Sequence, residues 1–132
     1  MEVTLELAQR GFSGLAFVNL VDFDMVYGHR NNRKGYAEAA TTFDRQLGTF
    51  MERMRDDDIL MITADHGCDP GFPGTDHTRE HTPFLVYGKS IREDVNLGTR
   101  ESFADIAATI LDIFNVENNT DGTSMKEYIL KK

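Results

Sequence analysis

Residues 59–67 read Ile59-Leu60-Met61-Ile62-Thr63-Ala64-Asp65-His66-Gly67, and this stretch decides the expected fold. The run from Ile59 to Ala64 is short and mostly apolar, which favours a buried β-strand. It ends in Asp65, His66 and Gly67, where polar chemistry begins. Gly67 permits a sharp backbone turn at that point, because glycine has no side chain to hinder it. The stretch therefore predicts a strand that delivers two potential ligands to the end of a sheet.

The segments before this stretch complete a β-α-β pattern. Residues 15–21, with the sequence LAFVNLV, are mostly apolar and predict another buried strand, which leads to Asp24. Residues 34–55 predict a long helix with one apolar face. That face carries Tyr36, Ala40, Phe43, Leu47, Phe50 and Met54. Strand, helix and strand in this order predict a parallel pair with a right-handed crossover, and hence an α/β fold. Since ligands bind beyond the carboxyl ends of parallel strands, we expect Asp24 and Asp65 to meet at one edge.

Other parts of the chain predict simpler elements. A short helix is expected over residues 3–10, a third strand over residues 83–88 and a short terminal helix over residues 125–130. Thr99 is expected to cap a helix that runs to about Phe114, with Phe103, Ile106, Ile110 and Ile113 or Phe114 facing inward. A long polar loop separates the second and third strands, and long loops at strand ends are often functional. No internal repeat or linker divides the chain.

Charge and composition narrow the classes of partner. The chain has 132 residues, with 14 basic and 22 acidic side chains and a formal net charge of −8. This balance argues against nucleic acid or an anionic membrane as a partner, because both need a basic face. A single cysteine, Cys68, cannot form an internal disulfide, so a cytoplasmic location is expected. No segment is typical of a membrane span or a signal peptide.

Histidine and aspartate residues gather near the predicted strand ends. A tight loop at Gly28 can bring Asp24 and His29 to one ion, although a helix-start aspartate and a surface histidine are the alternative. Asp65 and His66 fit a second ion position, or an ordinary transition from strand to loop. His77 is a candidate ligand only because these other residues are present, since a lone loop histidine is ordinarily exposed to solvent. Imidazole and carboxylate together suit manganese or zinc better than magnesium.

Several nearby residues are assigned lesser roles. His81, just before Pro83, is expected to form hydrogen bonds rather than ligate a metal. Cys68 is expected to be a spectator thiol, because no second cysteine supports a sulfur site. Arg79 and Glu80 suit either phosphate steering or a mutual surface ion pair, and the ion pair is the simpler interpretation.

Together these motifs resemble the phosphopentomutase family of the alkaline phosphatase superfamily. One matching stretch is Asn19-Leu20-Val21-Asp22-Phe23-Asp24, followed by Tyr27-Gly28-His29-Arg30. The other is Thr63 to Pro70, followed by Gly74-Thr75-Asp76-His77-Thr78-Arg79-Glu80, and Asp121 to Ser124 is also similar. The Asp-His-Gly core alone indicates only the superfamily, which also contains cofactor-independent phosphoglycerate mutases.

The resemblance implies a site, a reaction and an architecture. By motif position, Asp24, His29 and His77 correspond to ligands of one metal ion, and Asp65 and His66 to ligands of another. The family uses two manganese ions and interconverts ribose or deoxyribose 1-phosphate and 5-phosphate through a phosphothreonine, primed by a sugar bisphosphate. Its fold is a parallel-sheet three-layer core of alkaline-phosphatase-like type.

The resemblance also implies that residues 1–132 are the C-terminal part of the catalytic metal-binding core domain. The nucleophilic threonine, the cap domain and the N-terminal part of the core would then lie outside this sequence. We therefore expect no catalytic nucleophile here and no turnover of pentose phosphates by the isolated chain. The alternatives are a phosphoglycerate mutase, a metal-dependent phosphatase relative, or a non-enzymatic metal-binding module.

Overall fold

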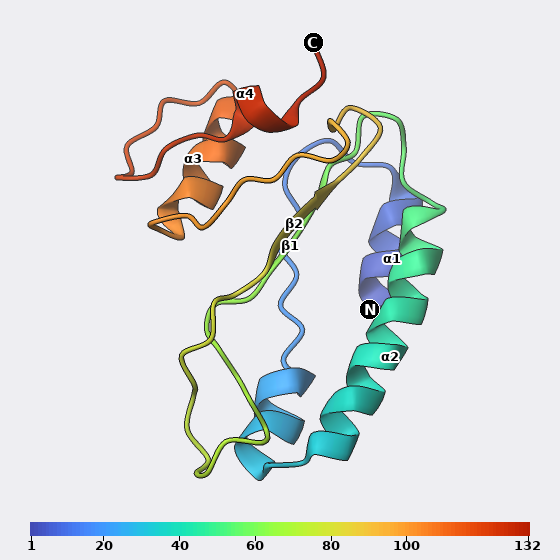
Figure 1. The fold of residues 1–132 in the computed structure, drawn as a ribbon. Helices are drawn as coiled ribbons and strands as arrows, with labels where there is room; N and C mark the ends of the chain where they lie inside the picture. The colour runs from blue at the N-terminus through green and yellow to red at the C-terminus, as the bar shows by residue number, and fades with distance from the viewer. The chain divides into compact units, whose positions relative to one another are not determined.

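A computed structural model describes all residues from 1 to 132, and they form two compact units. The first unit comprises residues 1–55 and 62–85, and the second comprises residues 56–61 and 86–132. The chain contains both helices and a small sheet, which confirms the mixed α/β class (Figure 1). The assignment of the whole chain to one catalytic core domain stays a prediction.

Helices dominate the first unit. Helix α1 spans Glu2–Arg10 and ends at Gly11, which adopts the left-handed conformation with φ of 61°. Helix α2 spans Arg33–Met51 and begins at Asn32, whose side-chain oxygen accepts a hydrogen bond from the Gly35 amide at 2.9 Å. This cap satisfies one of the amides that a helix start leaves without a partner. Both helices confirm the sequence prediction, although α2 ends a few residues earlier than expected.

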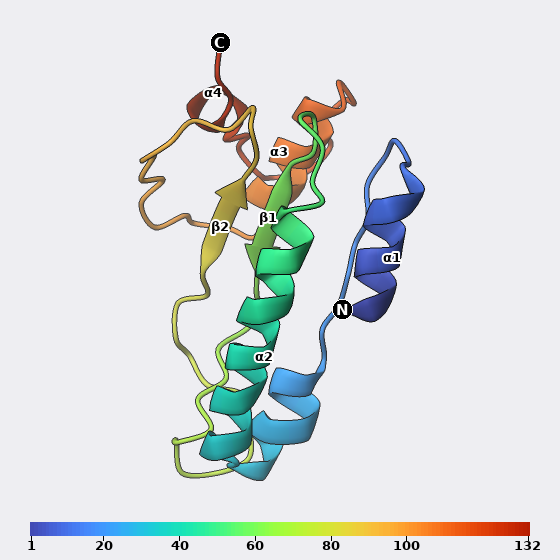
Figure 2. The ribbon, with the colours of Figure 1, turned by 90° about the vertical axis from the view of Figure 1, so that its right-hand side faces the viewer.

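Two short strands form the sheet. Strand β1 spans Leu60–Thr63 and strand β2 spans Phe84–Tyr87, and both match strands that the sequence predicts. They are neighbours in a two-stranded sheet and run antiparallel, as the opposed arrows in Figure 2 show. The chain between them, residues 64–83, forms a long loop that belongs to the first unit. In both views this loop lies beside the turns that precede α2.

The prediction of a strand over residues 15–21 is wrong for this chain. These residues form no strand, so the expected parallel pair with β1 is absent. Their apolar side chains are exposed, with Phe17 at 88% and Leu15 at 62% of their full accessibility. A strand is stabilised by hydrogen bonds to neighbouring strands and by side chains packed on its faces. No such neighbour pairs with this segment here, and sequence pattern alone does not reveal that.

The second unit has a small core around two helices. Helix α3 spans Ala104–Ile113 and helix α4 spans Lys126–Ile129. The buried apolar residues of the chain are Ile91, Ala108, Met125 and Ile129. Thr99 does not cap α3, so that prediction is wrong. The Ser102 hydroxyl instead accepts a hydrogen bond from the Ala104 amide at 3.1 Å.

The buried face of α3 is partly polar. Asp105 is only 5% exposed and Thr109 is fully buried. Asp105 accepts hydrogen bonds from the Arg100 side chain at 2.7 Å and from the Thr123 amide at 2.8 Å. The Thr109 hydroxyl accepts from the Met125 amide at 2.9 Å. These bonds attach the segment before α4 to α3, whereas the sequence pattern placed Phe103, which is 56% exposed, on the inward face.

Candidate metal centre

The first part of the candidate centre is a pair of tight turns before α2. The π-helical turn η1 spans Asp22–Tyr27 and the 3-10 turn η2 spans Gly28–Arg30. Gly28 is buried, and a β-carbon at this position would collide with the Cys68 sulfur and lie 3.0 Å from the Phe23 carbonyl oxygen. Glycine thus allows the turns to close, and they bring His29 Nε2 within 3.3 Å of Asp24 Oδ1. Asp24 and His29 therefore lie close together, and their shared coordination of an ion stays a prediction.

Aromatic packing fixes these turns against α2. The ring of Phe23 meets the Tyr36 ring edge-on, with centroids 5.1 Å apart, and the Phe43 ring at 6.3 Å. Such edge-to-face pairs add roughly 0.5–1.5 kcal/mol to the free energy of area burial. Because Asp24 follows Phe23 directly, this anchor sets the position of the carboxylate. Tyr36 and Phe43 belong to the apolar helix face that the sequence predicts.

The loop between β1 and β2 supplies the other imidazoles. Gly67 and Thr78 form an antiparallel bridge within this loop, and the Thr78 amide donates to the Gly67 carbonyl at 3.1 Å. His66 precedes Gly67 and His77 precedes Thr78, so the two histidines lie diagonally across the antiparallel bridge. Their rings stack with centroids 3.6 Å apart.

Three imidazole nitrogens converge on one carboxylate oxygen. Asp24 Oδ1 lies 3.3 Å from Nε2 of His29, 3.4 Å from Nε2 of His77 and 4.0 Å from Nε2 of His66. The ligand atoms of Asp24, His29 and His77 all lie within 4.8 Å of one another. Metal bonds of about 2.0–2.2 Å in tetrahedral geometry separate the ligand atoms by about 3.3–3.6 Å. The spacing of these atoms therefore fits coordination of a single ion.

Backbone carbonyl groups orient two of the rings. Nδ1 of His29 forms a short hydrogen bond with the Thr75 carbonyl, and Nδ1 of His66 bonds the Gly67 carbonyl at 2.9 Å. A carbonyl can only accept, so Nδ1 carries the proton in each bond. In a neutral ring with the proton on Nδ1, the Nε2 atom keeps a lone pair, which is available to a metal ion beside Asp24. Metal-bound histidines in proteins are fixed in this same way.

Asp65 lies at the most open part of the group. Its carboxylate is 90% exposed and lies 3.6 Å from His66 Nε2, whereas the side chains of Asp24, His29 and His66 are each less than one-third exposed. All five residues that the sequence predicts for the site thus lie in one cluster. Asp24, His29 and His77 form its compact part, and Asp65 and His66 form a neighbouring pair.

The structure also locates His81 and Cys68, which the sequence analysis did not assign as metal ligands. His81 is exposed and takes no part in the cluster. Cys68 is partly buried, with its sulfur 3.9 Å from Asp24 Oδ1. Burial, and then the nearby negative charge of Asp24, raises the pKa of the Cys68 thiol. Burial also raises the pKa of Tyr36, a neighbour of the site that sequence reasoning assigned only to the helix core.

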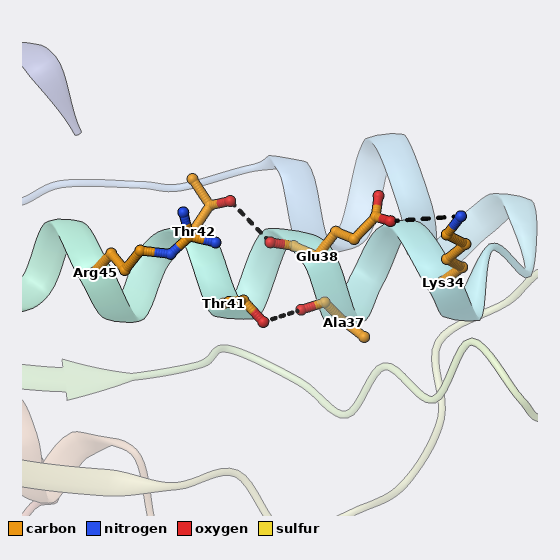
Figure 3. Close-up of a pocket in the computed structure, with 6 residues that line it drawn as sticks. All are labelled: Lys34, Ala37, Glu38, Thr41, Thr42 and Arg45. Atoms are coloured by element: carbon orange, nitrogen blue, oxygen red, sulfur yellow. Dashed lines mark hydrogen bonds and ion pairs between the residues drawn. The ribbon is translucent and has the colours of Figure 1, made fainter.

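A separate cavity of about 370 Å³ lies along the exposed side of α2 and contains no residue of the cluster. Figure 3 shows its lining, in which the Thr41 and Thr42 hydroxyls bond backbone carbonyls one turn earlier and Lys34 pairs with Glu38 at 3.7 Å. These polar groups already have partners within the helix. The chemistry of the chain is therefore concentrated at the histidine cluster.

The class of the protein follows from comparison with known families. The family model described as the Metalloenzyme superfamily matches residues 1–118. The chain therefore belongs to the metalloenzyme superfamily, and a cluster of imidazole and carboxylate ligand atoms is in keeping with that class.

Individual relatives give a narrower likeness. The chain is 58% identical over all 132 residues to the phosphopentomutase of Lachnoclostridium phytofermentans, and this alignment covers 34% of that protein. It is 64% identical over 114 residues, or 86% of the chain, to the phosphopentomutase of Carboxydothermus hydrogenoformans, covering 29% of it. It is 54% identical over 131 residues, or 99% of the chain, to that of Clostridium novyi, covering 34% of it. The resemblance to phosphopentomutases is confirmed, and the chain spans about a third of the length of these curated relatives.

Proposed function

We propose that this chain contributes the larger share of the metal centre of a phosphopentomutase. In this proposal Asp24, His29 and His77 hold one divalent ion, and Asp65 and His66 hold a second. The observation that carries it is the convergence of imidazole Nε2 atoms on Asp24 Oδ1 at 3.3 Å and 3.4 Å. Mixed imidazole and carboxylate ligands suit manganese, which we propose as the native ion.

The acidic character of the chain supports the need for metal ions. With a net charge of −8, the protein repels phosphate unless local cations offset the charge. Bound divalent ions supply positive charge for the phosphoryl oxygens and for an attacking oxygen. The chain's own residues then have a defined task. Asp24 provides the central carboxylate, and the Thr75 and Gly67 carbonyls keep two histidine rings in the ligating tautomer.

The proposed reaction is the interconversion of ribose or deoxyribose 1-phosphate and 5-phosphate. Support comes from relatives named phosphopentomutase that align with all or nearly all of the chain at more than 50% identity. We propose that a phosphothreonine and a sugar bisphosphate activator take part, and that the threonine is none of those in this chain. The chain by itself is then inactive toward pentose phosphates. A cytoplasmic location belongs to the same proposal.

The architecture of the whole protein is part of this proposal. The exposed apolar side chains of residues 15–21 are consistent with a strand that lacks its neighbours. We propose that this segment joins a parallel sheet of an alkaline-phosphatase-like three-layer core once the rest of the polypeptide is present. The remaining part of the same enzyme is thus the proposed partner of this surface.

A manganese titration tests the proposed centre. Free Mn²⁺ is followed by electron paramagnetic resonance as the chain is added, for the wild type and for His77→Ala. We expect His77→Ala to weaken manganese binding at least tenfold, because it removes one of three converging ligand atoms. His81→Ala is the matched control, since His81 is exposed and outside the cluster. Equal manganese affinity of wild type and His77→Ala would remove His77 from the centre.

The reaction class needs a second experiment. The full reading frame, with any codons upstream of Met1, is expressed and supplied with ribose 1-phosphate, a sugar bisphosphate activator and Mn²⁺. Phosphorus NMR then separates ribose 5-phosphate, the mutase product, from inorganic phosphate, the hydrolase product. Release of inorganic phosphate without ribose 5-phosphate would favour a phosphatase instead.

A further inference from the structure

A side-chain network outside the ligand set ties together the two loop segments that carry His66 and His77. Its centre is the Thr78 hydroxyl, which donates a short hydrogen bond to Glu80 Oε2 and accepts one from the Asp69 amide at 2.7 Å. A hydroxyl has a single proton, so its donor role is fully used by Glu80. Thr78 therefore connects the segment after His77 with the segment after His66.

The main chain of Thr78 reinforces this connection. Its amide donates to the Gly67 carbonyl at 3.1 Å, in the antiparallel bridge between the two segments. Thr78 thus bonds Gly67 through its main chain and Asp69 through its side chain, on either side of Cys68. The stacked rings of His66 and His77 lie immediately before these contacts, with centroids 3.6 Å apart. A change at Thr78 is therefore transmitted to the relative position of the two rings.

Glu80 packs closely on the same bridge. A β-carbon on Gly67 would lie 2.5 Å from Glu80 Oε2 and 2.7 Å from both the Glu80 amide nitrogen and the Thr78 carbonyl oxygen. Gly67 is buried, and only a residue without a side chain leaves room for this approach. Glu80 bonds the Thr78 hydroxyl, and no ion pair joins it to Arg79, so the expected surface ion pair is wrong. A hydrogen bond to a carboxylate is stronger than one between neutral groups.

We propose that Thr78 and Glu80 are positioning residues that hold His66 and His77 in the geometry for metal binding. This inference rests on the proposed metal centre, since it concerns the same histidines. In this proposal neither residue is itself a metal ligand. They act by ordering the loop before the metal arrives, which lowers the entropic cost of binding.

Substitutions at Thr78 test the inference through manganese affinity. Thr78→Val keeps the shape of the side chain but removes the hydroxyl, and we expect manganese binding to weaken by about 10–100-fold, as for other residues that orient metal ligands. Thr78→Ser keeps the hydroxyl and is expected to restore affinity to within about threefold of wild type, given the same hydrogen bonds. Thr41→Val is the matched control, because the Thr41 hydroxyl bonds only the Ala37 carbonyl on exposed α2.

Histidine NMR spectra of the metal-free chain provide an independent readout. We expect the ring signals of His66 and His77 to shift in Thr78→Val and to keep their wild-type positions in Thr78→Ser. If Thr78→Val does not fold, Glu80→Gln replaces it, because it keeps an acceptor oxygen but removes the charge. A loss of about threefold or more in manganese affinity then supports the inference, in line with the weaker neutral hydrogen bond.

The outcomes separate this inference from the proposed function. Wild-type chain that binds no Mn²⁺ at millimolar concentration overturns both. Wild-type chain that binds Mn²⁺ while folded Thr78→Val binds it equally well overturns the positioning role and leaves the metal centre standing. The same conclusion follows if Thr78→Ser binds as weakly as Thr78→Val, because the hydroxyl is then not the relevant group.

Discussion

Replacement of Asp105 by asparagine probes the polar face of α3 in the second unit. The Asp105 side chain is 7% exposed, and each of its carboxylate oxygens accepts one hydrogen bond. Arg100 Nε donates to Oδ2 at 2.7 Å, and the Thr123 amide donates to Oδ1 at 2.8 Å. Asparagine keeps one acceptor oxygen for Thr123 but presents an amide group to Arg100. Two donors then face each other at a position whose own side chain is almost fully buried.

The size of the effect follows from these two bonds. A hydrogen bond to a charged group contributes about 1.5–3 kcal/mol and a neutral one about 0.5–1.5 kcal/mol. Asp105→Asn removes the bond from Arg100 and reduces the bond from Thr123 to a neutral one. We expect the free energy of unfolding to fall by about 3 kcal/mol. For a chain of this size the thermal midpoint falls by about 10 °C.

The pH dependence of the free energy of unfolding gives a second test of the role of the ionised Asp105 carboxylate. The Thr123 amide, and then Arg100, hold the pKa of Asp105 below its ordinary value. A carboxyl with a lowered folded-state pKa stabilises the fold above its unfolded pKa of about 3.9. This stabilisation is lost as the pH falls through the lower folded pKa. The difference in free energy of unfolding between wild type and Asp105→Asn is therefore largest near pH 7 and shrinks below about pH 4.

Urea unfolding followed by far-ultraviolet circular dichroism measures this difference, since the chain has no tryptophan. Amide hydrogen exchange of α3 reports the second unit separately, because the chain forms two compact units. Asp121→Asn is the control for charge removal, as Asp121 is exposed nearby. A loss below about 1 kcal/mol for Asp105→Asn, or one equally large at pH 3 and pH 7, would refute the reasoning, because charge-assisted bonds are worth more than that.

Three further predictions concern the metal centre. Gly28→Ala forces a methyl group against the Cys68 sulfur, so we expect a loss of about 1–3 kcal/mol in stability by urea unfolding and weaker Mn²⁺ binding. Adding Cys68→Ala removes the collision with the sulfur and leaves only the approach to the Phe23 carbonyl oxygen. A double variant no more stable than Gly28→Ala would exclude the sulfur contact as the cause. Mn²⁺ at 100 times its Kd is expected to stabilise the wild type by about 2.7 kcal/mol in thermal unfolding, and to stabilise His77→Ala far less at that concentration. The isolated chain is expected to leave ribose 1-phosphate unchanged by phosphorus NMR even with Mn²⁺, and ribose 5-phosphate formation would contradict this.

Much of the candidate site was predictable because its residues lie next to strand ends and glycine turns that the sequence itself indicates. Asp65 and His66 follow the end of β1 after a single residue, and Asp24 and His29 lie in a segment with Gly28 that is too short to spread them apart. His77 was predictable only from its neighbours, since a lone loop histidine is ordinarily exposed. Their assignment as metal ligands stays a prediction. The carbonyl of Thr75, which orients His29, carries no sequence signal at all.

The sequence predictions that the structure contradicts failed because they depend on contacts between distant segments. Residues 15–21 have the composition of a buried strand, but composition does not state whether a partner strand is present. Phe103 fits the apolar period of α3, yet Asp105 is buried instead because Arg100 and the Thr123 amide satisfy its carboxylate. The bond between Thr78 and Glu80 links residues two apart, and only the loop conformation brings them together.

The sequence by itself determined which groups carry chemistry: an apolar run marks the β1 strand, and the aspartates, histidines and glycines around it mark turns with ligand side chains. Sequence alone predicts these features because side-chain chemistry and backbone flexibility are properties of individual residues and their immediate neighbours. Tertiary structure alone decided that His29 and His77, 48 residues apart, both face Asp24 Oδ1, and that residues 15–21 stay unpaired. Distances between segments depend on how loops close and on which strands are available, and those long-range contacts are not encoded in any single stretch of the chain.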